Sequence, residues 1–522
     1  MSLFIMENEN TLDWLIDLVE NAKSINTEEV KRNAVALVPT SLVESLLHNA
    51  ASAESSKELK LLGAGIPASP GAATGVVCFS SDSVLDAIDE DQKVILVCHE
   101  TSPADEIGMR MAEGIVTVRG GMASHAAVVA RGWGIPAVVG VSDLEISETE
   151  IKIGGNVVEE GACISLDGST GEVFSGEMEL QESSEEISEL KTILEWADEI
   201  RSGHIKVRAN SDTGEDTERA LSFGAEGIGL CRTEHMFMGD RLPLIQRFIL
   251  ADEGSEEEKE SLEELMIAQR SDLSDVISAM APNPVTVRLL DAPLHEFLGE
   301  ETPDEWLEHN PMLGTRGVRL AILREQLYRM QTRALIGALL DVKEIGKEPN
   351  VDIMIPLVSE VSELNLVRSW VAEEVESVEI ELRPSIGTMI ETPRAAITAE
   401  EIAKSADFFS FGTNDLTQLV FGFSRDDIES RVIGMYLDEG ILSANPFETL
   451  DFQGVGHVIK HAIEKGRKIN PELEIGVCGE HGGDPESIRF LFEAGVDYVS
   501  CSPFRVPIAR LAAAQAVLSS LK

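Results

Sequence analysis

The stretch Phe-Phe-Ser-Phe-Gly-Thr-Asn-Asp, residues 408–415, joins a short apolar run to the polar residues that come directly after it. A short apolar run bounded by Gly, Asp or Ser is typical of a buried strand. From residue 203 to the end of the chain, runs of this kind alternate with stretches of helical spacing. This alternation predicts βα units and a parallel sheet.

The C-terminal part is predicted to close into a barrel. About eight βα units over roughly 300 residues match the size of a (β/α)8 barrel. The predicted strands are Ile205–Ala209, Gly227–Leu230, Val285–Leu289, Ile353–Leu357, Ser385–Ile390, Phe408–Phe411, Ile475–Cys478 and Tyr498–Ser500. We therefore predict an α/β protein in which residues 204–522 form a (β/α)8 TIM barrel.

Three segments are predicted before the barrel. Residues 1–60 combine helical spacing with an Ala- and Ser-rich end, which indicates a helical preface and a linker. Residues 61–178 are rich in glycine and in short apolar runs, which predicts a compact β/α domain. Residues 179–203 are strongly acidic and have apolar residues at helical spacing, which predicts a helical linker that permits domain motion. The strands of the β/α domain are expected at Gly75–Phe79, Val94–Cys98, Gly114–Val118, Ala137–Val141, Ala162–Leu166 and Gly171–Phe174.

The charge of the chain limits its partners. The 92 acidic residues exceed the 42 Lys and Arg residues and give a net charge of −50. A nucleic acid or an anionic membrane surface would be repelled by the molecule as a whole, so we expect neither as a partner. An anionic substrate must then be held by local arginines. The acidity is compatible both with a salt-adapted host and with a role in solubility.

The cysteines and the N-terminus predict the compartment. The six cysteines contain no Cys-x-x-Cys pair, so neither a zinc site nor a disulfide framework is expected. The first ten residues lack a basic flank followed by an apolar core, and no apolar run approaches about 18 residues. We therefore expect a cytoplasmic protein that is neither exported nor membrane-spanning.

The stretch from Arg119 to Gly140 carries a histidine in an unusual position. The glycines at 120 and 121 follow a predicted strand, and Ser124-His125 opens a run of small residues that predicts a helix. A helix N-terminus offers unpaired N–H groups and the positive end of the helix dipole, which stabilise an anion such as phosphate. A lone histidine in such a turn could simply be a polar residue that caps the helix.

Polar residues follow most of the predicted barrel strands. They are Arg232-Thr233-Glu234, Arg288, Asp291, Glu391, Asn414-Asp415, Cys478-Gly479-Glu480-His481 and Ser502. Taken singly, each has an ordinary explanation as a solvated Arg, a helix-capping carboxylate or a small buried Cys. Barrel active sites form at the C-terminal ends of the strands, so the recurrence of polar residues there predicts that they converge on one mouth.

Several motifs resemble the enzymes that use phosphoenolpyruvate (PEP): pyruvate phosphate dikinase, PEP synthase and enzyme I of the sugar phosphotransferase system. The resemblance is carried by the His125 segment and by residues 229–237 (Gly-Leu-Cys-Arg-Thr-Glu-His-Met-Phe), 287–291 (Val-Arg-Leu-Leu-Asp), 310–317 (Asn-Pro-Met-Leu-Gly-Thr-Arg-Gly), 387–391 (Gly-Thr-Met-Ile-Glu), 409–418 and 478–483. The amino-acid sequences of residues 231–237 and 421–427 favour the dikinase over the other two enzymes. The similarity covers most of the chain from about residue 63 to residue 510.

The resemblance implies sites for PEP and for a metal, and elementary chemistry agrees. PEP carries a carboxylate and a phosphate, and planar guanidinium groups suit both, so Arg232, Arg288 and Arg316 are the expected anion ligands. Glu391 and Asp415 supply two hard oxygen ligands for Mg²⁺. The metal and the arginines would neutralise the enolate that forms when phosphorus leaves.

The resemblance also implies the two residues that do the covalent and proton chemistry. His125 is the expected phosphoryl acceptor, since a neutral imidazole nitrogen is available near pH 7. Cys478 is the expected proton donor to the methylene carbon, since a thiol of pKa about 8.5 is mostly protonated there. Asn414, with the backbone around Gly412 and Thr413, is a further expected substrate contact.

The leading hypothesis is therefore Mg²⁺-dependent, reversible phosphoryl transfer from PEP to His125, giving pyruvate, with the β/α domain swivelling towards the barrel. A phosphocarrier that passes phosphate from the histidine to a partner protein, as enzyme I does, is the alternative. A full dikinase has an ATP-grasp nucleotide-binding part, and the first sixty residues contain no Gly-rich phosphate loop. The chain is then a fragment, or has a separate ATP-grasp partner chain, or runs only the PEP half reaction. The family also suggests a homodimer.

Three further positions qualify the resemblance. His235 and His481 lack the spacing of a zinc site, so we expect both to play structural or supporting roles. Ala123 stands where the family usually has Thr two places before the histidine. Regulation by phosphorylation of that Thr is excluded for this chain, whereas catalysis at His125 is unaffected.

Overall fold

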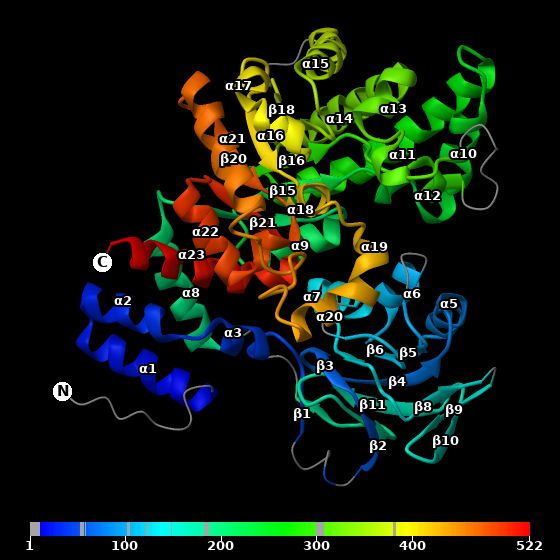
Figure 1. Ribbon diagram of the computed structural model, residues 1–522, viewed down its shortest axis with the longest axis vertical. Coiled ribbons are helices and arrows are strands. Elements are labelled where there is room, and N and C mark those ends of the chain that lie inside the picture. The colour runs from blue at the N-terminus through cyan, green and yellow to red at the C-terminus, as the bar shows by residue number, and fades with distance from the viewer. Residues whose placement is uncertain are drawn as a thin grey trace. The chain divides into compact units, whose positions relative to one another are not determined.

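The computed structural model describes residues 11–52, 57, 59–101, 105–121, 124–147, 149–181, 187–298, 307–378 and 383–521 (Figure 1). The chain divides into two compact units. The first unit consists of Met1–Ile200 together with Ser424–Glu448, and the barrel unit consists of Arg201–Phe423 with Thr449–Lys522. The domain limits predicted at residues 60, 178 and 203 stay a prediction.

The first unit is built on an eight-stranded mixed sheet with the order β2-β12-β11-β4-β5-β6-β7-β3. Its strands are β2 (Lys60–Ala64), β3 (Ile66–Ser69), β4 (Ala72–Cys78), β5 (Val94–Cys98), β6 (Gly114–Thr117), β7 (Ala137–Val139), β11 (Cys163–Asp167) and β12 (Glu172–Ser175). The four central strands from β4 to β7 are parallel. Helices α5 (Ser81–Asp89), α6 (Glu106–Met111) and α7 (His125–Trp133) connect them. The compact β/α fold predicted for this part of the chain is therefore present.

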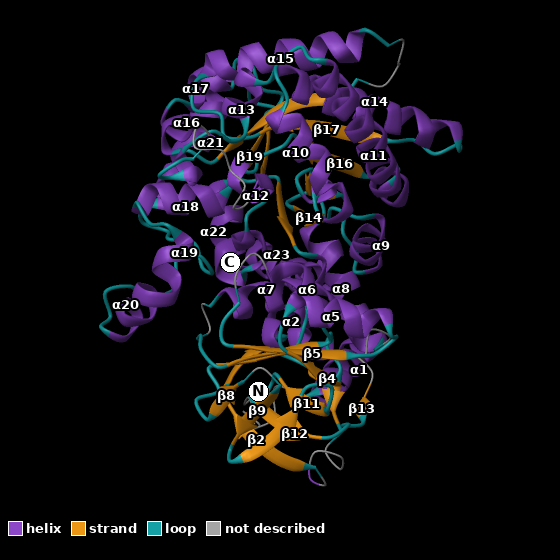
Figure 2. Cartoon of the chain, turned by 90° about the vertical axis from the view of Figure 1, so that its right-hand side faces the viewer, coloured by secondary structure: helices purple, strands orange, loops and turns teal. Residues whose placement is uncertain are grey.

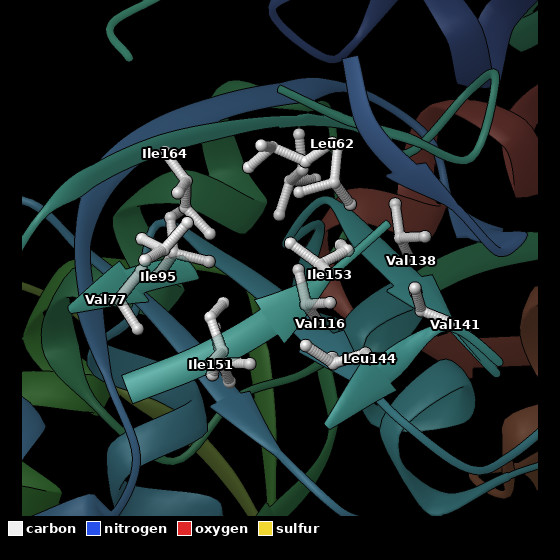
Figure 3. Packing of buried hydrophobic residues seen from close by; sticks show 14 of the residues in the cluster. Leu62, Val77, Ile95, Val116, Val138, Val141, Leu144, Ile151, Ile153 and Ile164 are labelled. Carbon is white, nitrogen blue, oxygen red and sulfur yellow. The ribbon is translucent and has the colours of Figure 1, made fainter. Parts of the chain in front are cut away.

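Both faces of this sheet are covered by apolar side chains, which explains why its central strands are continuous apolar runs rather than alternating ones. On one face, Val84, Met109 and Ala127 of the three connecting helices pack on the sheet. On the other face lies a small antiparallel sheet of β8 (Leu144–Ile146), β9 (Glu150–Ile153) and β10 (Asn156–Glu159). Figure 3 shows Ile151 and Ile153 of β9 in that second core.

Helices at both ends of the first unit agree with the predicted preface and linker. The preface forms α1 (Leu12–Ile25), α2 (Glu28–Leu37) and α3 (Thr40–Leu46), and the linker forms α8 (Ser188–Arg201). Thr27 caps α2 by accepting a hydrogen bond from the N–H of Val30, as its place before Glu28-Glu29 predicts. Short strands β1 (Ala50–Ala51) and β13 (Leu180–Gln181) pair beside them. Residues 53–56, 58 and 182–186, on which parts of the predicted linkers fall, lie outside the described residues.

An unpredicted feature is that residues 424–448 belong to the first unit although they lie between two barrel strands in the sequence. This segment contains α19 (Arg425–Ile428), a π-helical turn at Glu429–Ile433 and α20 (Gly434–Asp438). Glu448 at its end accepts a hydrogen bond of 2.5 Å from Nη2 of Arg131 in α7. No residue pattern in the segment distinguishes it from the loops around it.

The barrel unit is a closed ring of eight parallel strands, β14 to β21, which confirms the predicted TIM barrel. Figure 2 shows some of these strands, among them β16, β17 and β19, with helices around them. The strands are β14 (Lys206–Asn210), β15 (Ile228–Arg232), β16 (Pro284–Arg288), β17 (Asn350–Ile355), β18 (Ser385–Ile390), β19 (Phe408–Phe411), β20 (Glu474–Val477) and β21 (Tyr498–Cys501). The helices around the ring include α9 (Gly214–Ser222), α11 (Glu256–Met280), α14 (Glu325–Glu344), α15 (Val361–Glu376), α18 (Thr413–Phe421), α21 (Val455–Ile469), α22 (Pro485–Ala494) and α23 (Val506–Ser520). Among the described residues, no helix is both long and apolar enough to cross a lipid bilayer.

One predicted strand end is wrong in an informative way. The strand predicted to reach Leu357 ends at Ile355, and Leu357 adopts a positive φ of 57°. That conformation is costly for a branched residue. It lets the N–H of Leu357 donate to Oε1 of Glu391 at 2.6 Å, so the departure from strand geometry serves a polar contact at the end of the barrel.

Inside the barrel, glycines face large side chains. A Cβ atom at Gly476 would lie 1.9 Å from Cζ of Tyr498, and one at Gly387 would lie 2.5 Å from the ring of Phe408. Both aromatic residues are buried. Barrel interiors are filled in layers by alternating strands, so a small residue on one strand makes room for a large one on another.

We predict that Gly476→Ala lowers the free energy of unfolding by about 1–3 kcal/mol, because the new methyl group overlaps a ring that has no room to move. Chemical denaturation followed by circular dichroism measures the change. Gly434→Ala is the control, since nothing lies within 4 Å of its Cβ position and it begins α20. Equal effects of the two substitutions would contradict this packing of the barrel interior.

Candidate active site

The carboxyl ends of the barrel strands bring most of the predicted residues together. Arg232 and Arg288 end β15 and β16, Glu391 follows β18, and Cys478 follows β20. Asp415 lies in the first turn of α18, directly after β19. Asp291, Glu391 and Asp415 have oxygens within 4.8 Å of one another, and ion pairs join Asp291 to Arg288 and Arg316. For these residues, the convergence predicted from the strand ends is present in the structure.

A buried pair of arginines is held in place by one carboxylate. Asp291 accepts hydrogen bonds from Nε and Nη2 of Arg316 at 2.8 and 2.7 Å, and Nη1 of Arg288 lies 3.4 Å away. Burial alone would raise the pKa of Asp291, but the charges of Arg316 and Arg288 outweigh it and lower the pKa. This bidentate geometry fixes the plane of the Arg316 guanidinium.

Arg288 has a second carboxylate partner in Glu234. Nη2 of Arg288 donates to Oε1 of Glu234, and both residues are buried. Burial would lower the pKa of Arg288, but Glu234 and Asp291 raise it, so the guanidinium stays cationic. Nε of Arg288 and Oε2 of Glu234 are buried with no hydrogen-bond partner among the described residues. Unsatisfied buried polar atoms are rare, and these two retain a donor and an acceptor that are free to form a hydrogen bond.

Three carboxylates meet beside these arginines. Asp291, Glu391 and Asp415 each place an oxygen within 4.8 Å of the others. Oε2 of Glu391 is buried with no hydrogen-bond partner among the described residues, and it lies against Gly412, where a Cβ atom would come within 2.5 Å of it. Burial, followed by the charges of Asp291 and Asp415, raises the pKa of Glu391 to about 8.

This cluster fits a hard divalent cation. A cation would offset the repulsion among the carboxylates and satisfy the unpartnered oxygen of Glu391. Both oxygens of Asp291 are already engaged by Arg316, whereas those of Asp415 lie at the longer distances of 3.3 and 3.4 Å from the same guanidinium. Glu391 and Asp415 are therefore better placed than Asp291 to bind a metal.

Cys478 lies in an apolar wall of the same site. Its side chain is 1% exposed and packs with Leu230, Met354 and Met389. Burial and the charge of Glu391 outweigh the opposing influences and raise the pKa of the thiol to about 11. The thiol is therefore protonated throughout the neutral range, which is the state that a proton donor needs.

The loop at the start of α18 is tied to the loop after β20. The hydroxyl of Thr413 is hydrogen bonded to Nδ1 of His481 at 2.7 Å, and both residues are buried. Oδ1 of Asn414 accepts a hydrogen bond from the N–H of Glu480 at 3.0 Å. The expected supporting role of His481 agrees with this contact.

Two polar residues at the end of β14 were not predicted to belong to the site. Asn210 donates from Nδ2 to the carbonyl of Cys478 at 3.0 Å and accepts from the hydroxyl of Ser500 at 2.7 Å. Asp212 accepts a hydrogen bond of 2.6 Å from the N–H of Arg232. Both follow the rule that polar residues gather at strand ends, so applying the rule to the first strand would have found them. Ser502 starts a 3-10 turn, and its carbonyl accepts from the N–H of Arg505.

The predicted phosphoryl acceptor begins a helix as expected. Helix α7 starts at His125, and the hydroxyl of its N-cap residue, Ser124, accepts a hydrogen bond from the N–H of Ala127 at 3.4 Å. The helix ends at Trp133, and the next residue, Gly134, is its C-cap and has the positive φ that favours glycine. The side chain of His125 and the whole of Ala123 lie outside the described part of the chain.

Comparison with known proteins places both parts of the chain. Residues 184–518 match the model of the PEP-utilising enzyme PEP-binding domain, and residues 90–171 match that of the PEP-utilising enzyme mobile domain. Pyruvate, phosphate dikinase of Clostridium symbiosum is 47% identical over 97% of this chain and 60% of its own length.

Two further relatives give the same result. The chloroplastic pyruvate, phosphate dikinase 1 of Arabidopsis thaliana is 48% identical over 94% of this chain and 53% of its own length. The enzyme of Rhizobium meliloti is 46% identical over 94% of this chain and 57% of its own length. The chain thus spans little more than half the length of these relatives. With the PEP-binding model matched over most of its length, the chain belongs to the family of PEP-utilising enzymes.

Proposed function

We propose that this chain catalyses Mg²⁺-dependent, reversible phosphoryl transfer between PEP and His125, with pyruvate as the other product. This is the PEP half reaction of pyruvate phosphate dikinase. The observation that carries the proposal is the meeting of buried arginines, a carboxylate cluster and a protonated thiol at one end of the barrel. These groups match the three needs of the reaction, which are anion binding, charge neutralisation and a proton for carbon.

The arginines would bind the two anionic groups of PEP. Arg288 keeps an unpartnered Nε in a buried setting, and Arg232 is the more exposed of the two. Charge-assisted hydrogen bonds from guanidinium groups are short and directional, so they would orient the scissile phosphorus–oxygen bond. Arg316 is occupied by Asp291 and Asp415, which makes it a support for the carboxylate cluster more than a direct ligand.

Glu391 and Asp415 would hold the metal ion. Mg²⁺ bound there supplies positive charge close to the phosphate and enolate oxygens. Oε1 of Glu391 accepts a hydrogen bond from the N–H of Leu357, whereas its Oε2 atom has no hydrogen-bond partner among the described residues and is available to a cation. The charges of Arg288 and Arg316 partly offset the repulsion between Glu391 and Asp415. Asn414 precedes Asp415 and would contact the substrate from the same loop.

Two residues of this chain would accept the phosphoryl group and supply the proton. The bond between phosphorus and the enol oxygen of PEP breaks, and a bond between phosphorus and a ring nitrogen of His125 forms. The enolate of pyruvate takes a proton at its methylene carbon from the thiol of Cys478, and the resulting thiolate regains a proton from solvent or in the reverse reaction. A thiol with a pKa of about 11 returns readily to its protonated state.

The proposed reaction also has consequences for further domains and partner chains. The chain spans 60% and 53% of the length of two curated relatives, so a complete ATP-dependent reaction would need a nucleotide-binding part of the ATP-grasp kind, on this protein or on a partner chain. Movement of the β/α domain, a homodimer and a cytoplasmic location are further parts of the proposal. The match of residues 90–171 to a mobile domain supports the first of these.

We predict that the chain with Mg²⁺ exchanges labelled pyruvate into PEP and that His125→Asn abolishes the exchange, because the phosphoryl group then has no acceptor. Chromatographic separation of labelled pyruvate and PEP measures the rate. His457→Asn, on the outer helix α21, is the matched control and should exchange at the parent rate. Exchange that survives His125→Asn would refute the assignment.

Substitution of Glu391 by Gln should weaken metal binding at least about tenfold, because one of two anionic ligands is lost. Mn²⁺ serves as the probe, and the electron paramagnetic resonance signal of the free ion gives the affinity. Glu401→Gln, which removes a carboxylate from a surface ion pair with Lys404, should leave the affinity unchanged. Unaltered Mn²⁺ affinity in Glu391→Gln would place the metal elsewhere.

Substitution of Cys478 by Ala should lower the exchange rate by about 10²–10⁴-fold, because the proton donor is lost. The affinity for PEP, measured by calorimetry with Mg²⁺ present, should change by less than about threefold, since a thiol contributes little to binding an anion. Cys163→Ala in the first unit controls for the loss of a thiol as such. An exchange rate close to that of the parent chain would exclude Cys478 as the donor.

A further inference from the structure

Asp212 is a buried carboxylate that contacts the end of the neighbouring strand β15 and the turn that follows it. Oδ1 accepts from the backbone N–H of Arg232 at 2.6 Å, and Oδ2 accepts from Nδ1 of His235 at 2.7 Å. Nη1 of Arg232 lies 3.5 Å from the same Oδ2 atom. One carboxylate on the loop after β14 therefore contacts the main chain and the side chain of a proposed PEP ligand.

The ordinary explanation for an Asp in this place is a helix cap, and it does not apply. Thr213 caps α9, since its hydroxyl accepts from the N–H of Asp216 at 3.2 Å. The hydroxyl of Ser211 contacts Thr217 of the same helix at 2.8 Å. Helix α9 is thus capped without Asp212, whose carboxylate is directed towards the end of β15.

Arg232 depends on Asp212 more than the other two arginines depend on any single partner. Arg288 and Arg316 each contact two carboxylates and are almost fully buried. The side chain of Arg232 is 32% exposed, and among the described residues Asp212 is the carboxylate that it contacts. A long side chain at the rim loses much rotational freedom when it is held, so a fixed partner prepares it for binding.

His235 is held by a hydrogen bond to Oδ2 of Asp212, the oxygen that also lies near Arg232. Burial would raise the pKa of Asp212, but the hydrogen bond and charge of His235 and the charge of Arg232 hold it at about 2. An ionised carboxylate only accepts hydrogen bonds, so Nδ1 of His235 must carry a proton. The imidazole side chain is 42% exposed, which leaves part of the ring at the surface of the site.

The other charged groups near His235 have opposing effects. Arg232 and Glu234 come from its own segment, and Glu296 faces it from α12 (Leu294–Leu298). On the side of α11, Asp272 is paired with Arg241, which also donates to the carbonyl of Met236. Burial would lower the pKa of His235, but Asp212 and then Glu234 outweigh it and raise the pKa above the ordinary value.

We propose that Asp212 is a positioning residue that holds Arg232 and His235 side by side at the barrel mouth for binding the anionic groups of PEP. The inference rests on the proposed function, because PEP is the ligand that Arg232 would take. It gives a specific form to the supporting role expected for His235: the ring becomes a second cationic group beside Arg232 whenever it is protonated on both nitrogens. Asp212 itself does not touch the substrate.

The test is PEP binding in the His125→Asn background, in which no phosphoryl transfer can consume the ligand. Calorimetry with Mg²⁺ at several pH values compares this parent with Asp212→Asn, which keeps an acceptor for the Arg232 N–H but removes the charge. We expect PEP to bind about tenfold more weakly, as for the loss of one charge-assisted hydrogen bond. The affinity of the parent should fall as pH rises through the pKa of His235.

The pH profile distinguishes positioning from general destabilisation. In Asp212→Asn, the fall in PEP affinity should move to lower pH, since the imidazolium has lost its anionic partner. In His235→Asn, it should disappear, and this second variant gives the result if Asp212→Asn fails to fold. Asp341→Asn removes a carboxylate from the ion pair with Arg270 on the outer helices, and it should bind PEP as the parent does.

The outcomes separate the two proposals. Parent-like affinity and an unchanged pH profile in Asp212→Asn or His235→Asn would overturn the positioning role and leave the PEP site intact. A parent chain that binds no PEP would overturn both the proposed function and this inference. In the full chain with His125 present, a raised KM for PEP with kcat within about threefold of the parent is the expected kinetic counterpart.

Discussion

The bidentate contact between Arg316 and Asp291 is the interaction on which the rest of the site depends. Asp291 is buried and binds Arg316 through both oxygens while it also faces Arg288. Removing either partner would leave the other buried with only its longer contact, which is Arg288 for Asp291 and Asp415 for Arg316. The same guanidinium reaches Asp415, so a single ion-pair network connects the arginines proposed to bind PEP to the carboxylates proposed to bind the metal. Loops from different barrel strands can supply these groups because the ring closes and brings all the strand ends to one rim.

The network also explains how acidic groups can serve an anionic substrate. Asp291, Glu234 and Asp212 are each paired with an arginine, so their charges orient cations instead of repelling PEP. Glu391 is the exception, since one of its oxygens has no partner among the described residues and burial raises its pKa. A site of this kind gains its affinity for anions when a cation joins the carboxylate cluster. Cys478 sits outside the network in an apolar wall, where the thiol keeps its proton.

Much of this arrangement could be predicted from the sequence. The alternation of apolar runs and helical stretches predicted the barrel, and the polar residues after Leu230, Ile390 and Phe411 marked its functional end. Asp212 and Asn210 were missed because the polar residues at the end of the first barrel strand were not considered, and their roles become visible only through contacts with other strands. The fold of residues 424–448 with the first unit was not predictable from local patterns, because tertiary contacts such as that of Glu448 with Arg131 decide it. The domain limits and the roles of the individual site residues stay predictions.

The central claim is that the barrel mouth delivers the phosphoryl group of PEP to one histidine. The most direct measurement is phosphorus-31 nuclear magnetic resonance of the chain after incubation with PEP and Mg²⁺, with enzymatic assay of the pyruvate released. The account predicts a phosphohistidine resonance that is lost in acid and stable in base, one phosphoryl group per chain at His125, and an equal amount of pyruvate. Release of pyruvate without a phosphohistidine, or a phosphoryl group on any other residue, would contradict it.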